Sequence, residues 1–469
     1  MRRVTSELVR LMLYPLLQKR WHPLSHRYLR EFQKNEFASP ETIGTVQLES
    51  LKLLLRQAAT RVPYYRNLLR AHDIDPSRVR SFGDFVRVPI LTKAIVREHA
   101  RDLLASDADP QGLIPNASGG STGKPLQFYQ DRKYWDYAYA SQWFIHSWWG
   151  IRPGETTALI WGNDRDLPAK NWKEALAARI CQERVCNAFA LSEEKMEAFA
   201  RGLHSWQPLF IAGYASALHL FARFVLERPA LKIRPHAVKS AAEVLYDDER
   251  ALIEKAFECP VHDFYGSREV NNLAAECPAH TGLHVNALTR YIEIVDEAGH
   301  PMEPGLTGRV LVTDLVNYAM PFIRYENEDL ACWGASRCRC GRPFPLLAKV
   351  LGRKSDFIVT PAGKLIHGEF FTHLFYDMPQ VIKFQVVQES LTEMRLRVVL
   401  QPDTDLLSLE RLRERLGSAL GDGVACRIER VKEIERLPSG KHRFTISKVG
   451  PPSEAGSVQV EAKRGGLAV

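Results

Sequence analysis

Short apolar runs that alternate with helix-length segments are the feature of this sequence that most restricts its fold. Ala158–Trp161 and Leu209–Ala212 are short and mostly apolar, as expected of strands that are buried on both faces of a sheet. Helical patterns occupy Glu193–His204 and Ala215–Leu226. This alternation indicates helices layered on a sheet, which is an α/β fold. With 469 residues, the chain is too long for one ordinary domain, and we expect two or three.

The remainder of the chain divides into a strand-rich segment and a second unit. Between about residues 285 and 333, strands are expected at Tyr291–Val295, Gly308–Thr313 and Pro321–Tyr325. After Gly352, the expected elements are strands at Phe357–Thr360, Lys383–Val387 and Arg395–Leu400, a helix at Leu409–Leu420 and a strand near Ala425–Arg430. We therefore predict a large domain over residues 1–352, a small α+β domain over residues 353–450 and a disordered tail over residues 451–469.

Two further segments have a helical pattern. Residues 46–61 form a pattern that ends before Pro63. Residues 134–149 read YWDYAYASQWFIHSWW, with eight aromatic residues and no helix breaker. This second segment predicts a buried helix, which either belongs to the core, the favoured interpretation, or lines an apolar substrate pocket.

The positive charge of the chain is concentrated at its amino terminus. The first 30 residues hold seven Lys and Arg and one Glu, a net charge of +6, whereas the whole chain carries +8. The nearly neutral body argues against binding of nucleic acid. Residues 1–45 are interpreted as a basic helical arm, in which Leu8, Leu11, Met12 and the pair Leu16 and Leu17 form an apolar face. The arm either contacts an anionic membrane or a partner, or packs on its own domain, and the second interpretation is favoured.

A glycine-rich segment is the first candidate site. Residues 118–129 read SGGSTGKPLQFY, in which glycines allow backbone N–H groups to converge on an anion and hydroxyls and a lysine add further contacts. The segment is not a Walker loop, because Ser118 and Pro125 stand where that motif requires Gly and Ser or Thr. Taken alone, it is either a phosphate loop or a flexible surface loop. Its candidate phosphate-binding residues are Ser118, Gly119, Gly120, Ser121, Thr122, Gly123 and Lys124.

Five motifs in order give a family resemblance. SGGSTGKP is similar to the phosphate loop of the adenylate-forming superfamily, which includes acyl-CoA synthetases, peptide-synthetase adenylation domains and luciferase. Further motifs of that superfamily follow in its order: YGSRE at 265–269, RYENED at 324–329, GRKSD at 352–356 and PSGKHR at 438–443. LLRQAATRVPYYRNLL, GLH at 282–284 and CRCGRPFP at 338–345 resemble the phenylacetate–coenzyme A ligase branch with its CapK-like members. The resemblance extends from about Leu51 to Lys448.

The resemblance implies a two-step reaction. A carboxylate attacks the α-phosphorus of ATP to give an acyl-adenylate and pyrophosphate, and a nucleophile, usually the thiol of coenzyme A, then takes the acyl group and releases AMP. It also implies a large amino-terminal domain and a small mobile carboxy-terminal domain. An amine, a hydroxyl or a carrier-protein thiol stays open as the acceptor. A non-catalytic relative that binds nucleotide is the alternative of a different class.

Motif matching implies roles for individual residues. The ATP-binding set is Ser118, Thr122 and Lys124 at the phosphates, Tyr265 against adenine, Ala242 and Glu243 at the adenine edge, Asp329 at the ribose hydroxyls, and Gly266 and Arg353 within the same motifs. Glu269 would hold Mg²⁺, a hard ion that suits a carboxylate. Arg268 would lie beside the α-phosphate, and Lys441 would reach both the α-phosphate and the substrate carboxylate.

Three positions depart from the family pattern. Arg268 replaces the usual Ser or Thr, and an arginine is longer and always charged. At the hinge, Ser355 stands where the family often has the pivoting Asp, and Asp356 follows it. Residues 362–366 follow the thiol-transfer loop only loosely, so the acceptor is less firmly implied than adenylation.

Four residues in two clusters suggest structural zinc. Cys338 and Cys340 form a C-x-C pair, and Cys277 and His284 lie about 60 residues earlier. Three thiolates and one imidazole make a closed tetrahedral zinc site, with no open position for catalysis. His284 is preferred to His280 because it belongs to the GLH motif. The alternative is free thiols with a hydrogen-bonded His284.

Cysteine usage and hydropathy suggest a compartment. Eight cysteines are sparse for this length, so a reducing cytoplasm is the expected location. No window of about 18 residues is apolar throughout, and no membrane span is expected. The expected ligands are a small carboxylic acid, ATP, Mg²⁺ and coenzyme A, and a monomer and a homodimer both stay open.

Overall fold

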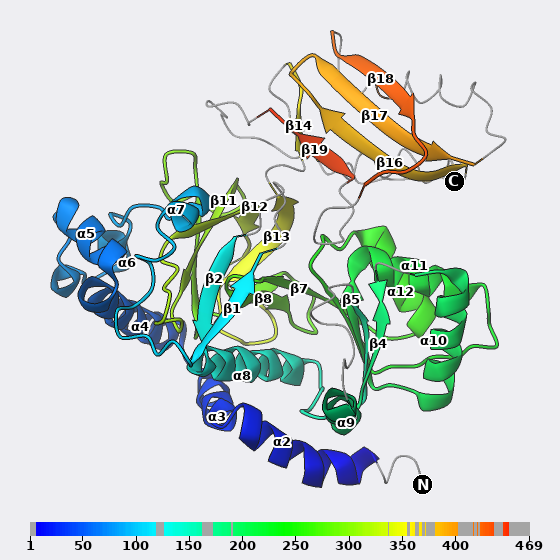
Figure 1. The fold of residues 1–469 in the computed structure, drawn as a ribbon, viewed down its shortest axis with the longest axis horizontal. Helices are drawn as coiled ribbons and strands as arrows, with labels where there is room; N and C mark the ends of the chain where they lie inside the picture. Colours follow the sequence, from blue (N-terminus) through cyan, green and yellow to red (C-terminus); the bar gives the residue numbers. More distant parts are fainter. Residues whose placement is uncertain are drawn as a thin grey trace.

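The computed structural model describes most of the chain (Figure 1). The described residues are 6–118, 126–161, 172–188, 191–335, 337–353, 357–361, 365–367, 371, 380–401, 416, 420, 423–435 and 444–449. The helical segments are η1 (Val9–Leu13), α2 (Tyr14–Trp21), α3 (Ser25–Asn35), α4 (Pro40–Arg61), α5 (Pro63–Ala71), η2 (Pro76–Arg78), α6 (Phe82–Phe85), α7 (Lys93–Glu98), α8 (Arg132–Trp148), α9 (Trp172–Ile180), α10 (Glu193–Trp206), α11 (Ala215–Leu226) and α12 (Asp247–Phe257).

One large sheet organises most of the described chain. Its strand order is β10-β11-β12-β13-β9-β8-β7-β6-β5-β3-β4. The strands are β3 (Thr157–Trp161), β4 (Glu183–Asn187), β5 (Phe210–Tyr214), β6 (Ala237–Ala241), β7 (Val261–Ser267), β8 (Asn271–Glu276), β9 (Leu283–Val285), β10 (Arg290–Val295), β11 (Thr307–Asp314), β12 (Tyr325–Trp333) and β13 (Leu346–Arg353). Strands β3 to β7 pair in parallel, and the pairs from β7 to β10 are antiparallel.

Both faces of the parallel half are buried, as predicted for continuously apolar strands. In β5, Phe210 and Ala212 belong to one hydrophobic cluster and Ile211 belongs to another. Successive side chains of a strand point to opposite faces, so each face has its own core. Helices α11 and α12 pack on one face and α8 lies beside the sheet on the other (Figure 1). The predicted α/β class is confirmed.

The aromatic segment is helix α8, and most of it is core. Tyr134, Phe144 and Ile145 are fully buried in the larger hydrophobic cluster. The amino-terminal helix α3 packs along α8, where the rings of Tyr28 and Tyr137 stack with centroids 3.6 Å apart. The core interpretation of this helix therefore agrees with its burial.

One strand prediction in the antiparallel half is wrong. The sequence predicted a strand over Pro321–Tyr325, but β12 begins only at Tyr325. The preceding apolar residues form a buried loop whose backbone bonds to a side chain: Tyr65 Oη donates to the carbonyl of Pro321 and accepts from the N–H of Ile323. Arg324, with φ of +49°, then turns the chain into β12. Apolar residues fill the core here without forming a ladder.

A second, four-stranded sheet follows the large one in the chain. Its order is β18-β17-β16-β19, with β16 (Val381–Gln388) and β17 (Glu393–Leu400) antiparallel in its centre. Strands β18 (Ala425–Arg430) and β19 (Thr445–Ser447) flank them, and β14 (Phe357–Val359) pairs with β15 (Leu365–His367). The predicted strands of this unit are present. The predicted helix at Leu409–Leu420 and the tail fall mostly or wholly outside the described residues, and the boundary at residues 352 and 353 stays a prediction.

Candidate active site

The parallel strands place aromatic side chains at one edge of the sheet. Trp161 ends β3, Tyr214 ends β5 and Ala242 directly follows β6. The rings of Trp161 and Tyr214 lie 4.6 Å apart between centroids. The carboxyl ends of parallel strands are where α/β proteins bind ligands, so this edge is the candidate site.

Tyr265 and Asp329 are in direct contact, although 64 residues separate them. Tyr265, near the end of β7, donates its hydroxyl to Asp329 Oδ2 at 2.7 Å. Asn327 Nδ2 donates to both, at 2.6 Å to Tyr265 Oη and 2.8 Å to Asp329 Oδ2. The N–H of Asp329 donates in turn to Asn327 Oδ1 at 3.1 Å. This network fixes the carboxylate and leaves Asp329 Oδ1 as the oxygen not used by Tyr265 or Asn327.

The charge of Asp329 is balanced by neighbouring cations. Burial raises the pKa of Asp329, while Arg353, the hydrogen bond from Tyr265 and Lys93 act against that rise. Arg353 lies opposite Asp329 in the register of β12 and β13. Burial and the adjacent carboxylate raise the pKa of Tyr265, so its hydroxyl keeps its proton and remains a donor.

Glu269 is a buried carboxylate in the turn between β7 and β8. Its Oε1 accepts a hydrogen bond from Tyr325 Oη at 3.3 Å, and its backbone carbonyl accepts from Gln130 Nε2 at 3.2 Å. Glu269 forms no ion pair with any residue in the described parts of the chain. A buried carboxylate without a cationic partner is unusual, and it suits a bound hard cation. Arg268 precedes it and is half-buried, with its carbonyl 3.4 Å from Gln130 Nε2.

The glycine-rich segment connects two strands of a hairpin. Strands β1 (Leu113–Ala117) and β2 (Gln127–Asp131) pair antiparallel, with Ala117 opposite Gln127. Ser118 closes the connection, because its N–H donates to the carbonyl of Leu126 at 2.9 Å and its Oγ accepts from the N–H of Leu126 at 3.1 Å. Gly119, Gly120, Ser121, Thr122, Gly123 and Lys124 lie outside the described residues, and their phosphate-binding role stays a prediction.

The remaining candidate nucleotide residues lie at the same edge. Ala242 follows β6 with φ of +67°, and Glu243 Oε2 accepts a hydrogen bond from the N–H of Ser216 at 2.9 Å, in the first turn of α11. This carboxylate therefore supports the helix amino terminus. Gly266 is close-packed, since a Cβ there would lie 2.9 Å from the carbonyl oxygen of Asn271. Lys441, Ser355, Asp356 and residues 362–364 lie outside the described residues.

Three further residues of this region were not assigned a role from the sequence. Asn327 and Tyr325 belong to the RYENED motif, so that motif could have identified them. No sequence pattern pointed to Lys93, which lies 235 residues before Glu328. It is almost fully buried, and its Nζ is 2.5 Å from Glu328 Oε2. Only the fold brings it to the site.

Arg324, the first residue of the RYENED motif, makes contacts that stabilise the fold. Its guanidinium makes two hydrogen bonds to Glu293, at 3.1 and 3.0 Å, and one to the carbonyl of Val88 at 2.7 Å. Both charged side chains are buried. The pair therefore ties the start of β12, the strand that carries Asn327 and Asp329, to β10 and to the segment before α7.

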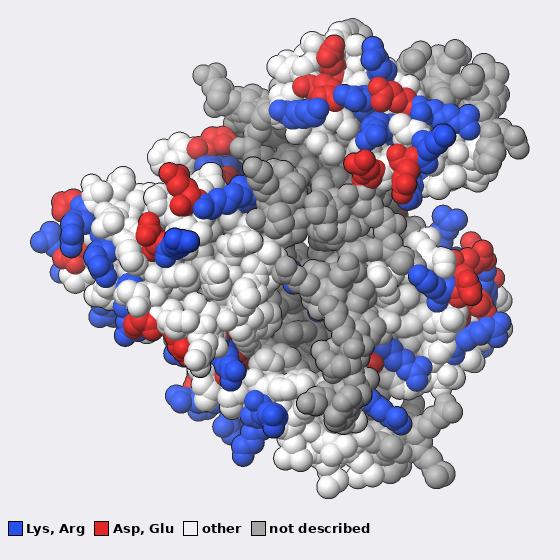
Figure 2. All heavy atoms as spheres, in the orientation of Figure 1, with Lys and Arg blue, Asp and Glu red and all other residues white. Residues whose placement is uncertain are grey.

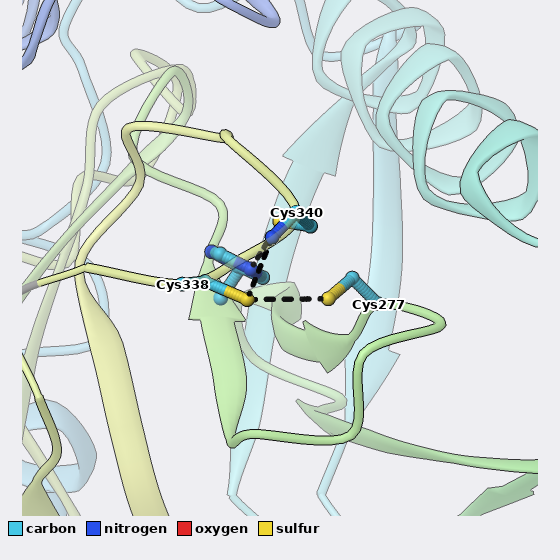
Figure 3. A group of neighbouring side chains, drawn as sticks. Cys277, Cys338 and Cys340 are labelled. Carbon is cyan, nitrogen blue, oxygen red and sulfur yellow. Dashed lines mark hydrogen bonds between the residues drawn. The ribbon is translucent and has the colours of Figure 1, made fainter.

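Three cysteines, Cys277, Cys338 and Cys340, converge beside the antiparallel strands (Figure 3), and His284 belongs to the same group. The ligand atoms of Cys277, His284, Cys338 and Cys340 all lie within 4.8 Å of one another. Cys277 and Cys338 sulfurs are 3.6 Å apart, and Cys340 Sγ is 3.3 Å from His284 Nε2. Zinc–sulfur bonds of about 2.3 Å in a tetrahedron place sulfur atoms about 3.8 Å apart, so this spacing fits zinc.

Backbone hydrogen bonds reach every sulfur of the cluster, and at Cys338 the hydrogen bonds favour the thiolate form. Each sulfur accepts a backbone N–H from two residues further on: Cys277 from Ala279, Cys338 from Cys340, and Cys340 from Arg342, at 3.4 to 3.5 Å. Burial alone would raise the pKa of Cys338, but the Thr281 hydroxyl and the Cys340 N–H lower it overall, whereas burial raises the pKa of Cys277 to about 12. Thiolates are the zinc-binding form of cysteine.

His284 has the orientation of a ligand. Its Nδ1 lies 3.2 Å from the carbonyl of Phe344, a bond in which Nδ1–H donates and Nε2 is left to face Cys340. Burial lowers the pKa of His284 to about 4, so the imidazole is neutral near pH 7. The structure places His280 in a different group, with His262 and Glu276.

Comparisons with known proteins identify relatives in sequence and in fold. A family model described as the CapK C-terminal domain matches residues 358–448. Protein CapK of Staphylococcus aureus is 23% identical, over 82% of this chain and 85% of its own length. Phenylacetate–coenzyme A ligase of Thermus thermophilus is 25% identical, over 89% of this chain and 96% of its own.

A solved structure shares the fold over most of its length. It is 2-hydroxyisobutyryl-CoA ligase in the postadenylation state, with a TM-score of 0.69, 22% identity and coverage of 89% of this chain and 92% of that chain. This match extends over both the large sheet and the small unit. The chain therefore shares the fold of this ligase, matches the CapK C-terminal domain model over residues 358–448, and is similar in sequence to CapK and to phenylacetate–coenzyme A ligase.

Proposed function

We propose that this protein is an AMP-forming acid–thiol ligase, which activates a carboxylic acid with ATP and passes the acyl group to coenzyme A. The observation that carries the proposal is the contact between Tyr265, Asn327 and Asp329, next to the buried Glu269. The relatives named phenylacetate–coenzyme A ligase support the acid and the thiol as substrate classes. Asp329 would accept hydrogen bonds from the ribose hydroxyls, and the ring of Tyr265 would lie against adenine.

The fixed carboxylate explains how the site would bind a nucleotide. Tyr265 and Asn327 hold Asp329 through Oδ2, so Oδ1 can meet the ribose without a change of rotamer. Such preorganisation reduces the entropy that binding costs. Positioning and charge stabilisation are the main contributions that a protein makes to displacement at phosphorus. Lys441, from the small unit, is proposed to neutralise the negative charges of the two reacting groups.

Glu269 is the proposed magnesium ligand. Its carboxylate is buried and keeps Oε2 without a hydrogen bond to the described residues, while Tyr325 orients Oε1. The ion would neutralise phosphate charge. We propose Arg268, beside Glu269, for contact with the α-phosphate, because a guanidinium can donate two parallel hydrogen bonds to phosphate oxygens.

Pyrophosphate exchange with a panel of carboxylic acids tests the activity. We expect at least one acid to support exchange of label between pyrophosphate and ATP, and Glu269→Gln to lose most of it. Glu303→Gln, an exposed carboxylate in a turn, is the matched control and keeps exchange. No exchange with any acid would favour the non-catalytic relative. Product analysis with coenzyme A, amines, alcohols and a carrier protein then identifies the acceptor.

We further propose that Cys277, His284, Cys338 and Cys340 hold one structural zinc ion. The ion would connect the end of β8, strand β9 and the loop between β12 and β13. We expect about one zinc per chain in protein purified without chelator, and Cys338→Ser to lose both zinc and thermal stability. Cys259→Ser, a half-buried cysteine outside the cluster, is the control. Metal-free wild-type protein with full stability would reject the site. A reducing compartment, which the cytoplasm provides, would keep these cysteines out of disulfides and available to zinc.

A further inference from the structure

The first helices of the chain turn their leucines outward and their polar side chains inward. Leu8 directly before η1, Leu11 in η1 and Leu16 in α2 are 54%, 60% and 67% exposed. The buried residues of α2 are Tyr14 and Gln18, and both hydrogen-bond to the hydroxyl of Tyr139 in α8, at 2.8 and 2.9 Å. A helix that only stabilised its own domain would bury the leucines instead. The interpretation favoured from the sequence, that the arm packs on its own domain, therefore accounts only for the inner face of these helices.

The exposed apolar side chains are concentrated in this short segment. Among the described residues, sixteen large apolar side chains are exposed, and seven of them lie between Leu8 and Leu24. These seven are Leu8, Leu11, Met12, Leu13, Leu16, Trp21 and Leu24, and together they are called the outer face below. Scattered exposed leucines are ordinary, but a gathering of this kind marks an interaction surface.

The outer face is held in a fixed position. Gly154 makes room for the buried side of α2, because a Cβ at this position would lie 2.8 Å from the ring of Tyr14. Gln182 Nε2 donates to the carbonyl of Ser6 at 3.1 Å, and His22 stacks on Tyr139 with ring centroids 4.3 Å apart. The helices are thus docked on the large domain with their leucines already displayed, so binding through this face needs little ordering.

Positive charge surrounds these apolar side chains. Residues 6–35 contain six Lys and Arg and two Glu, a net charge of +4. The two acidic residues are already paired, Glu7 with Arg10 and Glu31 with Arg27. Lys19, Arg20 and Arg30 form no ion pair with the described part of the chain. In Figure 2 the lower edge of the molecule, over α2 and α3, carries Lys and Arg side chains next to uncharged surface.

We infer that the outer face binds the surface of an anionic lipid bilayer. Leucines with an interfacial tryptophan beside unpaired cations are the composition of a helix that lies in the headgroup region. The eight residues of α2 span about 12 Å, too little to cross a bilayer, and no helix in the described ranges is long and apolar enough to do so. The helix would therefore lie on the membrane and bring the large domain to it.

A second copy of the chain fits this face less well. A two-fold dimer would place the same patch on both subunits, and each patch carries +4. Like charges across an interface are unfavourable, whereas anionic lipid headgroups supply the opposite charge. The inference does not depend on the proposed ligase activity, because it concerns a surface away from the candidate active site.

Vesicle flotation with the full chain tests the inference. We expect the protein to float with vesicles of phosphatidylglycerol and phosphatidylcholine, to float far less with phosphatidylcholine alone, and to be released by salt. Leu11→Ser with Leu16→Ser should weaken binding about tenfold or more per leucine, since both side chains would enter the lipid. Lys19→Gln with Arg20→Gln should weaken it about fivefold per charge.

Matched variants control for general effects. Leu220→Ser changes an exposed leucine of α11, and Arg70→Gln with Arg80→Gln removes two exposed cations elsewhere, so flotation should not change. Circular dichroism and thermal unfolding verify that every variant folds. Absence of flotation with anionic vesicles would overturn the inference. So would a dimer in sedimentation that the leucine variant abolishes while flotation is unaffected, because the face would then belong to a second copy.

Discussion

The ribose contact of Asp329 can be tested by combining one substitution with one altered nucleotide. Asp329→Asn keeps the size of the side chain and removes its charge. Tyr265 and Asn327 already occupy Oδ2, so Oδ1 is the oxygen available to the ribose hydroxyls. A hydrogen bond to a charged group contributes about 1.5–3 kcal/mol, so ATP should bind about tenfold to hundredfold more weakly to the variant.

The altered nucleotide separates a ribose contact from a general disturbance. In calorimetry, 2′,3′-dideoxy-ATP should bind the wild type more weakly than ATP does, and it should bind wild type and Asp329→Asn almost equally. The loss of binding free energy from the substitution and the loss from removing the ribose hydroxyls are then not additive, as expected when the two groups interact directly. Tyr265→Phe should produce a smaller loss, because Asp329 keeps its hydrogen bond from Asn327. If Asp329→Asn weakened both nucleotides equally, the carboxylate would not contact the ribose.

Three further outcomes follow from buried charges and from the second domain. Burial lowers the pKa of Lys239 in β6 to about 8. Between this pH and the higher pKa that Lys239 has in the unfolded chain, the unfolded chain binds more protons than the folded one, so the free energy of unfolding rises with pH. Lys239→Met should add up to about 3 kcal/mol to the free energy of unfolding at pH 7 and remove that rise, as measured by urea unfolding; an unchanged pH dependence would refute it. Glu293→Ala leaves Arg324 buried without its partner and should cost about 3–5 kcal/mol in the same assay, whereas exposed Glu303→Ala should cost little. Lys441→Ala should abolish adenylate formation and spare acyl transfer from a synthetic acyl-adenylate, and equal loss of both half-reactions would contradict a step-specific lysine.

Elements whose hydrophobic pattern is local could be predicted from the sequence. The helix expected at Ala215–Leu226 has those bounds in the structure, because its apolar residues repeat with the helical period. The strand expected at Pro321–Tyr325 failed because a distant tyrosine, Tyr65, satisfies the backbone there. An apolar run shows that a segment is buried, but it does not show which group receives its hydrogen bonds.

In the candidate site too, some residues could be predicted from the sequence and others could not. Tyr265, Glu269 and Asp329 lie in short motifs whose order along the chain could be read directly. Lys93 could not be found, because its link to Glu328 exists only after the fold has formed. The outward leucines show the limit most clearly: their periodicity predicts a helix, but the face that becomes buried depends on Tyr139 and Gly154, more than 100 residues away.

A crystal structure of the protein soaked with ATP and an acid that supports pyrophosphate exchange would show whether this site forms an acyl-adenylate. We expect an acyl-adenylate at the carboxyl ends of β3, β5, β6 and β7. Its ribose would meet Asp329, its adenine would lie along Tyr265 and its acyl group would extend toward Trp161 and Tyr214. A nucleotide bound at another place, or at this place with its ribose away from Asp329, would rule out the proposed active site.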